Sequence, residues 1–422
     1  MKEVGILSQK LTLTDQRQSL LGFAEPKVDP LLQHSIREQL KALTTEKLTD
    51  CQRRANLCES MNLVVATLLQ QETAKHEVLT KIFQELYEHA LQSMAKADIS
   101  QQNLTHEYLS PTGYVMSPLN GRTTIKDIYR LHRFIRGIDK AITARLKNDT
   151  VIRILYPACG PFAPLLLPLI QYYRSHNLAT EQQIQITLVD VQPGAIQAVT
   201  QLVSDLSIQG FIENIVEADA TLYEPEQTFD LLILEAMQHG FTKEGQLSIA
   251  KHLIQFLSVD GVLIPQQISV QAMMVHGENE FNQQWKESAF SHSTNLDREV
   301  VQDRVELGEI FQISKSSLLA LEEVILPSKI KMVRANRISL PTGIEDMKDR
   351  VLAIYATLNV YSNEFIREYD SGITHPKPDM TFYVDTPPRT PQPEHFLTFS
   401  GGDVQFYYQL TGLPGFVALQ AD

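Results

Sequence analysis

The stretch of residues 151–190 constrains the fold more than any other part of the chain, because it holds two apolar runs joined by a turn and a helix. The runs cover residues 151–155 and 184–189, and a strand buried on both faces of a parallel sheet has such a near-continuous apolar sequence. A Cys-Gly-Pro turn follows the first run, and an acid follows the second. The stretch therefore predicts the first βαβ unit of a nucleotide-binding α/β domain.

Two residues of this unit are candidates for contact with an adenosine ligand. Gly160 lets the backbone turn tightly, and the helix N-terminus beyond it offers free N–H groups. Asp190 stands at the carboxyl end of the second strand, where ligands bind in open α/β sheets. Its carboxylate can accept hydrogen bonds from both hydroxyls of a ribose.

The pattern continues through three further segments. Residues 216–220 (VEADA) predict a short third strand with an acid at its end, and residues 229–236 (FDLLILEA) predict a buried fourth strand with Glu235 at its end. Apolar residues then recur at helical spacing from 249 to 257, before an Asp-Gly turn at residues 260–261 leads into VLIP. This succession is typical of an open parallel sheet.

These features resemble the class I S-adenosylmethionine-dependent methyltransferases, whose members share a CGP-type first loop, an acid ending strand two, a D-A pair after strand three and a DGxLIP-like turn. The resemblance covers residues 151–275 and implies a Rossmann-like, doubly wound α/β sheet, S-adenosyl-L-methionine as the cofactor and a transferase activity. The residues alone also allow an α/β domain that binds another adenosine cofactor or none, since fold does not fix the ligand. The sequence has neither a GxxxxGK[ST] phosphate loop nor a GxGxxG turn after the first strand.

The resemblance also implies which residues hold the cofactor. The family usually has an acid and three spaced glycines at the end of strand one and in the first loop, where this chain has Tyr156, Ala158, Gly160 and Phe162. Tyr156 carries no charge at neutral pH, and Phe162 either lends a ring face to the sulfonium or packs in the core. The implied cofactor-binding residues are Tyr156, Ala158, Cys159, Gly160, Pro161, Phe162, Asp190, Val191, Asp219, Ala220, Glu235 and Arg133.

The loop after the fourth strand, EAMQHGFTKE, supplies the candidate catalytic residues Glu235, His239 and Glu244. Glu235 and Glu244 stand nine positions apart, so they could bring two carboxylates onto one substrate cation. Glu235 could also orient an amine or act as a base, and His239 could take a proton near pH 7. Glu235 and His239 could instead cap the next helix. No metal site is predicted, because the 12 histidines form no HxxxH or HExxH pair.

The chain is long enough for more than one structural unit, and its pattern changes twice. We predict an N-terminal helical bundle at residues 1–110, a Rossmann-like S-adenosylmethionine-binding domain at 111–275 and a β-rich substrate or lid region at 276–422. Apolar residues at three- and four-residue spacings predict helices over 53–71 and 79–94. In the last region, β-branched and aromatic segments between Pro and Gly predict antiparallel strands. This linear order resembles that of protein arginine methyltransferases.

Two polar segments are candidates for closing the site. A helix is predicted over residues 125–138, and in the fold that the resemblance implies, such a helix lies over the cofactor. The Pro-punctuated loop at 368–379 either reaches over the active site or is an ordinary surface turn. The helix either presents a solvated charged face or supplies residues that bind the cofactor carboxylate or an acidic substrate. The candidates for this role are Arg130, His132, Arg133 and Arg136.

Composition limits the partners and the location. Lys and Arg number 37 against 50 Asp and Glu, a net charge of −13, which argues against a nucleic-acid substrate. The three cysteines form no CxxC or disulfide framework, which favours a reducing compartment. No signal peptide and no apolar stretch long enough for a bilayer are seen, so we expect a cytoplasmic protein without a membrane partner. A homodimer is left open.

Three functions fit these patterns. The first is methyl transfer from S-adenosyl-L-methionine to a small-molecule or peptidic nucleophile. The second uses the same cofactor to transfer or cyclise its aminocarboxypropyl group with release of methylthioadenosine, as azetidine-carboxylate and nicotianamine-type synthases do. The third is a non-catalytic protein that binds an adenosine cofactor.

Overall fold

The computed structural model describes residues 48–70, 75–147, 150–285, 296–325, 329–387, 389–390 and 392–421. Residues 51–422 belong to one compact unit. The part of the predicted helical bundle at residues 1–47 lies outside the described residues. Among the described helices, none has both the length and the hydropathy that a membrane span requires.

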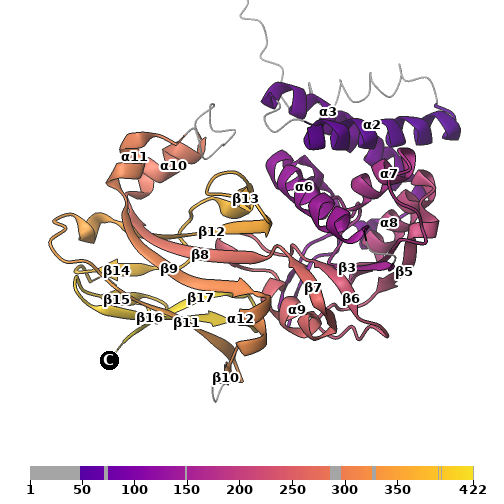
Figure 1. Cartoon of the computed structure of the whole chain (residues 1–422). Helices are drawn as coiled ribbons and strands as arrows, with labels where there is room; N and C mark the ends of the chain where they lie inside the picture. Colours follow the sequence, from indigo (N-terminus) through magenta and orange to yellow (C-terminus); the bar gives the residue numbers. More distant parts are fainter. Residues whose placement is uncertain are drawn as a thin grey trace, which may run out of the picture. The chain divides into compact units, whose positions relative to one another are not determined.

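A five-stranded parallel sheet forms the centre of the α/β region, in the strand order β5-β4-β3-β6-β7 (Figure 1). Its strands are β3 (Ile152–Pro157), β4 (Ile184–Asp190), β5 (Ile212–Glu217), β6 (Phe229–Ile233) and β7 (Leu257–Ile264). The strand order reverses direction at β3, which is therefore the switch point where ligands bind in doubly wound sheets. The connecting helices are α7 (Leu167–Ser175), α8 (Pro193–Leu206) and α9 (Gln246–Leu253). The predicted doubly wound fold is confirmed.

The Asp260–Gly261 pair lies inside β7 and not in a turn before it. The register between β6 and β7 shifts at this point, with Phe229 opposite Leu257 but Leu231 opposite Val262. The additional residues form a bulge whose carbonyl groups accept hydrogen bonds from the ammonium group of Lys315 at 2.7–3.1 Å. An Asp-Gly pair suits a bulge as well as a turn, and here the long-range contact to Lys315 accompanies the bulge.

Helices precede the sheet as the sequence predicts. α2 (Asp50–Gln70) and α3 (His76–Met94) match the helices expected at residues 53–71 and 79–94, and α6 (Ile128–Arg145) is the last helix before strand β3. The apolar stripe of α3 is buried, and α3 contacts α8 of the α/β region. The shorter helices are α4 (Gln101–Thr105), α5 (Pro118–Gly121), α10 (Gly277–Trp285), α11 (Arg298–Asp303) and α12 (Lys315–Ala320).

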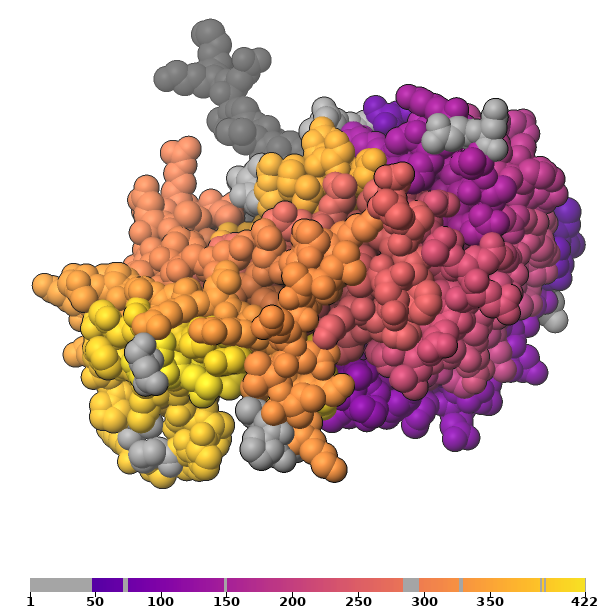
Figure 2. All heavy atoms as spheres, turned by 60° about the horizontal axis from the view of Figure 1, so that its bottom comes forward, coloured from indigo at the N-terminus to yellow at the C-terminus, as the bar shows by residue number. Residues whose placement is uncertain are grey.

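The residues after β7 form two antiparallel four-stranded sheets, β13-β12-β8-β9 and β10-β11-β16-β17. Their strands are β8 (Gln267–Val275), β9 (Val305–Ser314), β10 (Glu323–Ile325), β11 (Lys331–Ser339), β12 (Val351–Tyr361), β13 (Glu364–Ile366), β16 (Asp403–Gln409) and β17 (Gly415–Gln420). Strand β8 thus lies in a β-rich sheet, although its residues precede the domain boundary predicted at 275. In the space-filling view, the C-terminal residues form one continuous surface, orange to yellow (Figure 2).

One strand pair departs from the predicted antiparallel pattern. Strands β14 (Phe382–Val384) and β15 (Phe396–Thr398) run parallel. The segment between them is too long for a tight hairpin, so the chain can run back to the end of the sheet where β14 begins before β15 starts.

The β-rich region also packs on the loop that follows β6. The ring of Tyr408 contacts the rings of Phe241, Phe311 and Phe416, and its hydroxyl donates a hydrogen bond to the carbonyl of Phe241 at 3.0 Å.

A buried ion pair joins the first helix to the α/β region. Arg53 of α2 donates to both carboxylate oxygens of Asp205 in α8, and Ser93 of α3 donates to the same carboxylate at 2.6 Å. Only 6% of the Arg53 side chain and none of the Asp205 side chain is exposed. Burial raises the pKa of Asp205, but the hydrogen bonds from Arg53 and Ser93 outweigh it and hold that pKa below its ordinary value.

We predict that Arg53→Met lowers the free energy of unfolding by about 3 to 5 kcal/mol, because it leaves the Asp205 carboxylate buried without its main cation. Urea denaturation followed by circular dichroism measures this change. The control is Arg54→Met, since Arg54 lies 3.3 Å from the same carboxylate but is 43% exposed. Arg54→Met should lower the free energy of unfolding by only about 0 to 1 kcal/mol. An equal loss of unfolding free energy in the two variants would contradict the role given to the Arg53–Asp205 pair.

Candidate functional site

A cavity of about 430 Å³ opens at the carboxyl ends of β3, β4 and β6. This volume lies in the range of small-molecule sites. Its walls come from the first loop, the ends of the three strands, helix α6, the loop after β6 and the residues around Ile373. The hairpin of β1 (Tyr108–Ser110) and β2 (Gly113–Val115) completes the lining.

Gly160 and Asp190 form one wall of this cavity. The backbone N–H of Gly160 donates to Asp190 Oδ2 at 2.8 Å, and that of Gln192 donates to Oδ1 at 2.9 Å. Burial raises the pKa of Asp190, an effect that the backbone hydrogen bonds from Gln192 and Gly160 partly offset. Gly160 has a φ of +66°, and a Cβ built on it meets no atom within 4 Å. The carboxylate is therefore fixed beside open space.

Most residues that the resemblance assigned to the cofactor line the cavity. They are Tyr156, Ala158, Cys159, Gly160, Pro161, Asp190, Val191, Asp219, Ala220 and Glu235. Phe162 does not line it: only 2% of this residue is exposed, and it packs in the core, the alternative that the sequence left open. Asp219 follows strand β5 by two residues, and its Oδ1 accepts hydrogen bonds from the N–H and the hydroxyl of Thr221.

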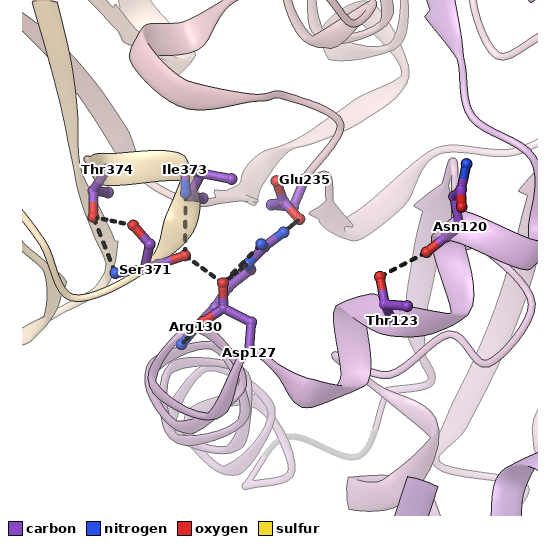
Figure 3. A network of polar contacts seen from close by, with 8 residues as sticks. All are labelled: Asn120, Thr123, Asp127, Arg130, Glu235, Ser371, Ile373 and Thr374. Carbon is purple, nitrogen blue, oxygen red and sulfur yellow. Dashed lines mark hydrogen bonds and ion pairs between the residues drawn. The ribbon is translucent and has the colours of Figure 1, made fainter. Parts of the chain in front are cut away.

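An ion-pair network holds the inner face of α6 against the strand ends (Figure 3). The guanidinium of Arg130 donates to Glu235 Oε2 at 2.7 Å and to Asp127 Oδ2 at 2.8 Å. Asp127 also caps the N-terminus of α6 by accepting from the N–H of Arg130. The hydroxyl of Ser371, from the C-terminal region, donates to Asp127 Oδ2 at 2.6 Å.

Arg133 lies outside the cavity, although it was among the implied cofactor-binding residues. It donates to Glu364 Oε2 at 3.0 Å, and Arg136 donates to Glu364 Oε1 at 2.9 Å. Arg133 stands nearly one helical turn beyond Arg130, so the helix carries its side chain past the strand ends to β13. His132 is buried and does not line the cavity either.

The two candidate glutamates have different surroundings in the same cavity. Glu235 is matched by the charge of Arg130. Burial raises the pKa of Glu244 to about 7, helped by the negative charge of Glu235, while a hydrogen bond from Gln238 acts in the other direction. Glu244 can therefore exchange a proton near neutral pH.

His239 is a poor proton acceptor at neutral pH, contrary to the role that the sequence suggested. Burial lowers its pKa to about 4, and the positive charges of Lys377 and Lys243 add to this effect. The histidine lines the cavity as a neutral ring. Lys377 comes from the loop that the sequence identified at residues 368–379, and that loop does reach this cavity.

The structure adds site residues that the sequence did not single out. Asp127, Ser371 and the hairpin of β1 and β2 carry no motif, and only Asp127 has a local signal, as an N-cap before a helix. Gly113 has a φ of +147°, and a Cβ on it would lie 2.7 Å from the backbone nitrogen of Gly245. The N–H of Tyr114 donates to the carbonyl of Lys243 at 2.8 Å. The hairpin thus holds the backbone beside Glu244.

A group of possible metal ligands lies apart from this cavity. His276, Asp303 and Asp346 each bring one ligand atom within 4.8 Å of the others. Arg350 donates to Asp346 at 2.8 Å and to Asp303 at 3.1 Å, so a guanidinium already supplies positive charge to both carboxylates. The three residues are explained by this ion pair without a metal.

Comparison with known proteins finds likeness only among solved structures. No family model matches the sequence, and no curated protein matches it. The Trypanosoma brucei PRMT1 enzyme-prozyme heterotetrameric complex with AdoHcy is 12% identical over 71% of this chain and 92% of that chain, with a TM-score of 0.40. Protein arginine methyltransferase 10 of Arabidopsis thaliana is 10% identical over 65% of this chain and 84% of that chain, with a TM-score of 0.36. TM-scores of this size identify neither ligand nor activity, so function has to rest on the site.

We predict that Glu244 makes the protein less stable as pH rises through about 7. Its folded pKa of about 7 exceeds its ordinary 4.5, so the folded protein prefers the protonated acid. The stability that this preference supplies is fully present below about pH 4.5 and is lost as pH rises through 7, a change of about 3 kcal/mol. Urea denaturation measures the free energy of unfolding of wild type and Glu244→Gln across pH 4.5 to 8. As pH rises, this free energy should increase for the variant relative to the wild type.

The control for this experiment is Glu224→Gln, because Glu224 is exposed and lies outside the cavity. Its stability should follow that of the wild type at every pH. A Glu244→Gln curve that runs parallel to the wild-type curve would show that Glu244 titrates normally.

Proposed function

We propose that this protein is an S-adenosyl-L-methionine-dependent methyltransferase that acts on a nitrogen nucleophile of a small-molecule or peptidic acceptor. One observation carries the proposal. A single cavity at the switch point of a doubly wound sheet joins the Gly160–Asp190 wall to the acidic pair Glu235 and Glu244. The first pair suits an adenosine sugar, and the second suits a cationic or proton-releasing acceptor.

The residues of the cavity fit this cofactor. Each oxygen of the Asp190 carboxylate accepts one backbone N–H and keeps acceptor capacity for the two hydroxyls of a ribose. The open space beside Gly160 lets a ligand approach the backbone closely. Arg130 lines the same cavity, and the carboxylate of a methionine part would share its guanidinium with Asp127 and Glu235.

The remaining residues fit the acceptor half of a methyl transfer. When bound, S-adenosyl-L-methionine supplies an electrophilic methyl group on a positively charged sulfur. Glu244, with a pKa of about 7, is suited to take the proton that the acceptor nitrogen releases. Glu235, fixed by Arg130, is suited to orient that nitrogen. The hairpin and the loop around Ile373 line the cavity together with these two glutamates, so they are suited to limit the access of water.

One observation favours the aminocarboxypropyl chemistry as a second candidate. Tyr156 stands at the end of β3, where methyltransferases of the resembling class usually have an acid. Burial raises the pKa of Tyr156 well above its ordinary value, so the side chain supplies no negative charge to an ammonium group. A cofactor amine that is not held as a cation could act as a nucleophile.

The nucleoside released from S-adenosyl-L-methionine separates these functions. We expect adenosylhomocysteine when amines are offered as acceptors, detected by chromatography and mass spectrometry. Methylthioadenosine would support the second candidate. Cofactor binding without release of either nucleoside from a panel of amine, guanidine and peptide acceptors would contradict both.

We predict that Asp190→Ala weakens S-adenosyl-L-methionine binding by roughly ten- to a hundredfold, because two buried hydroxyls lose their acceptor. Titration calorimetry measures the affinity. The matched control is Glu217→Ala: Glu217 pairs with Asp190 across the strand ends but is exposed and lies outside the cavity. Its affinity should equal that of the wild type. A folded Asp190→Ala protein with full affinity would remove Asp190 from the cofactor site.

We predict that Glu244→Gln lowers turnover by roughly a hundredfold and leaves cofactor affinity unchanged, because the amide cannot take a proton. The wild-type rate should rise with pH through about 7, as the raised pKa of Glu244 requires, and the variant should lack this rise. Rates of nucleoside release from pH 5 to 9 provide the measurement. Loss of cofactor affinity in the variant at an unchanged maximal rate would place Glu244 in the cofactor half of the cavity.

A further inference from the structure

A second cavity of about 380 Å³ adjoins the first. It lies between the end of β8, the start of α10, the start of β12 and the loop that carries Lys377. His239 and Lys377 line both cavities, so the two spaces meet at these side chains. The apolar part of its wall is made by Val275, Phe281, Val351, Ala353, Pro376 and Pro378.

The one carboxylate on this wall already has its hydrogen-bond partners. Glu280 is 4% exposed, and both of its carboxylate oxygens accept hydrogen bonds, from Arg304 and from the hydroxyl of Tyr369. Only 2% of the Arg304 side chain is exposed, and its guanidinium also lies 2.8 Å from Glu368, which does not line this cavity. The wall therefore offers apolar surface and a carboxylate whose oxygens are taken up by buried partners.

The passage between the cavities disfavours a cationic group. Lys377 is held there by two backbone hydrogen bonds with Ile354, at 3.0 and 3.1 Å. His239 and Lys377 line this passage together, and the positive charge of Lys377 helps to lower the pKa of His239. A cation that entered from the first cavity would meet this ammonium group in a partly buried space, whereas an alkyl or aryl group would not be repelled.

We propose that the second cavity is a specificity pocket for the acceptor, and that it holds an alkyl or aryl group attached to the nitrogen that is methylated at Glu244. The inference rests on the proposed methyltransferase function and names the acceptor class: an apolar amine or guanidine, as opposed to a polycation. The first cavity then holds the cofactor and the nucleophile, and the second holds the apolar remainder of the acceptor.

The full chain is tested with butylamine, hexylamine and 3-phenylpropylamine, and with 1,5-diaminopentane as the cationic counterpart. The measured quantity is kcat/KM for nucleoside release. Each methylene that becomes buried should raise kcat/KM by about fourfold, so hexylamine, with two more methylenes, should exceed butylamine by roughly fifteenfold. It should exceed 1,5-diaminopentane by more, because the second amine of that compound is charged. Equal values for hexylamine and 1,5-diaminopentane would overturn the inference.

Two substitutions fill the pocket from two different segments, β12 and the loop that carries Lys377. The first is Val351→Trp; Val351 is 36% exposed and pairs with Val275 of β8. The second is Pro378→Trp; Pro378 is an exposed residue of the loop. Either should remove the preference for hexylamine and leave cofactor affinity unchanged. The matched control is Val324→Trp on β10, which is 42% exposed and outside the pocket, and it should keep the preference. Retention of the preference in both filled variants would overturn the inference.

A binding measurement separates this inference from the proposed function. Hexylamine is titrated into protein saturated with adenosylhomocysteine, and calorimetry should show binding that Val351→Trp weakens at least tenfold and Val324→Trp does not. This result does not depend on turnover. Absence of nucleoside release with every acceptor would contradict methyl transfer. If hexylamine does not bind, or if it binds the Val351→Trp variant as tightly as the wild type, the specificity pocket is wrong even if methyl transfer occurs.

Discussion

The ion pairs of Arg130 are the interaction on which the geometry of the site depends. This one guanidinium bonds Asp127 at the start of α6 and Glu235 beyond β6, and Ser371 from the C-terminal region bonds the same Asp127. Three segments that are distant in the sequence are therefore fixed around one cation whose side chain is 13% exposed. Removing any charge of such a network leaves another without its partner in a largely buried site, which costs more than losing a surface ion pair.

The same cation also gives the two acids of the cavity different properties. Glu235 is paired with Arg130, whereas desolvation and the negative charge of Glu235 raise the pKa of Glu244. A carboxylate held by a guanidinium and a second carboxyl group that exchanges a proton near pH 7 can take different roles in one site. The β1–β2 hairpin maintains this arrangement, because the backbone of Gly113, at the start of β2, packs directly against that of Gly245.

The sequence predicts the parallel sheet well, because strands buried on both faces leave continuous apolar runs. It also predicts that Gly160, Asp190 and Glu235 share one edge, since the carboxyl ends of parallel strands meet there. It does not predict Ser371, which lies 244 positions from its partner Asp127 and has no periodic or motif signal. Nor does it separate Arg130 from Arg133, because a charged helix face looks alike until its partners are known.

The carboxylate of Glu364 has a consequence for motion. It is 2% exposed and accepts contacts from Arg133, Arg136 and Lys140, so the outer face of α6 is bound to β13 while its inner face is bound to the strand ends. A hinge between the parallel sheet and the β-rich sheets would have to break one of these two sets of ion pairs, whichever region α6 moved with. Local displacement of a surface segment such as the β1–β2 hairpin would open the cavity and leave both sets intact.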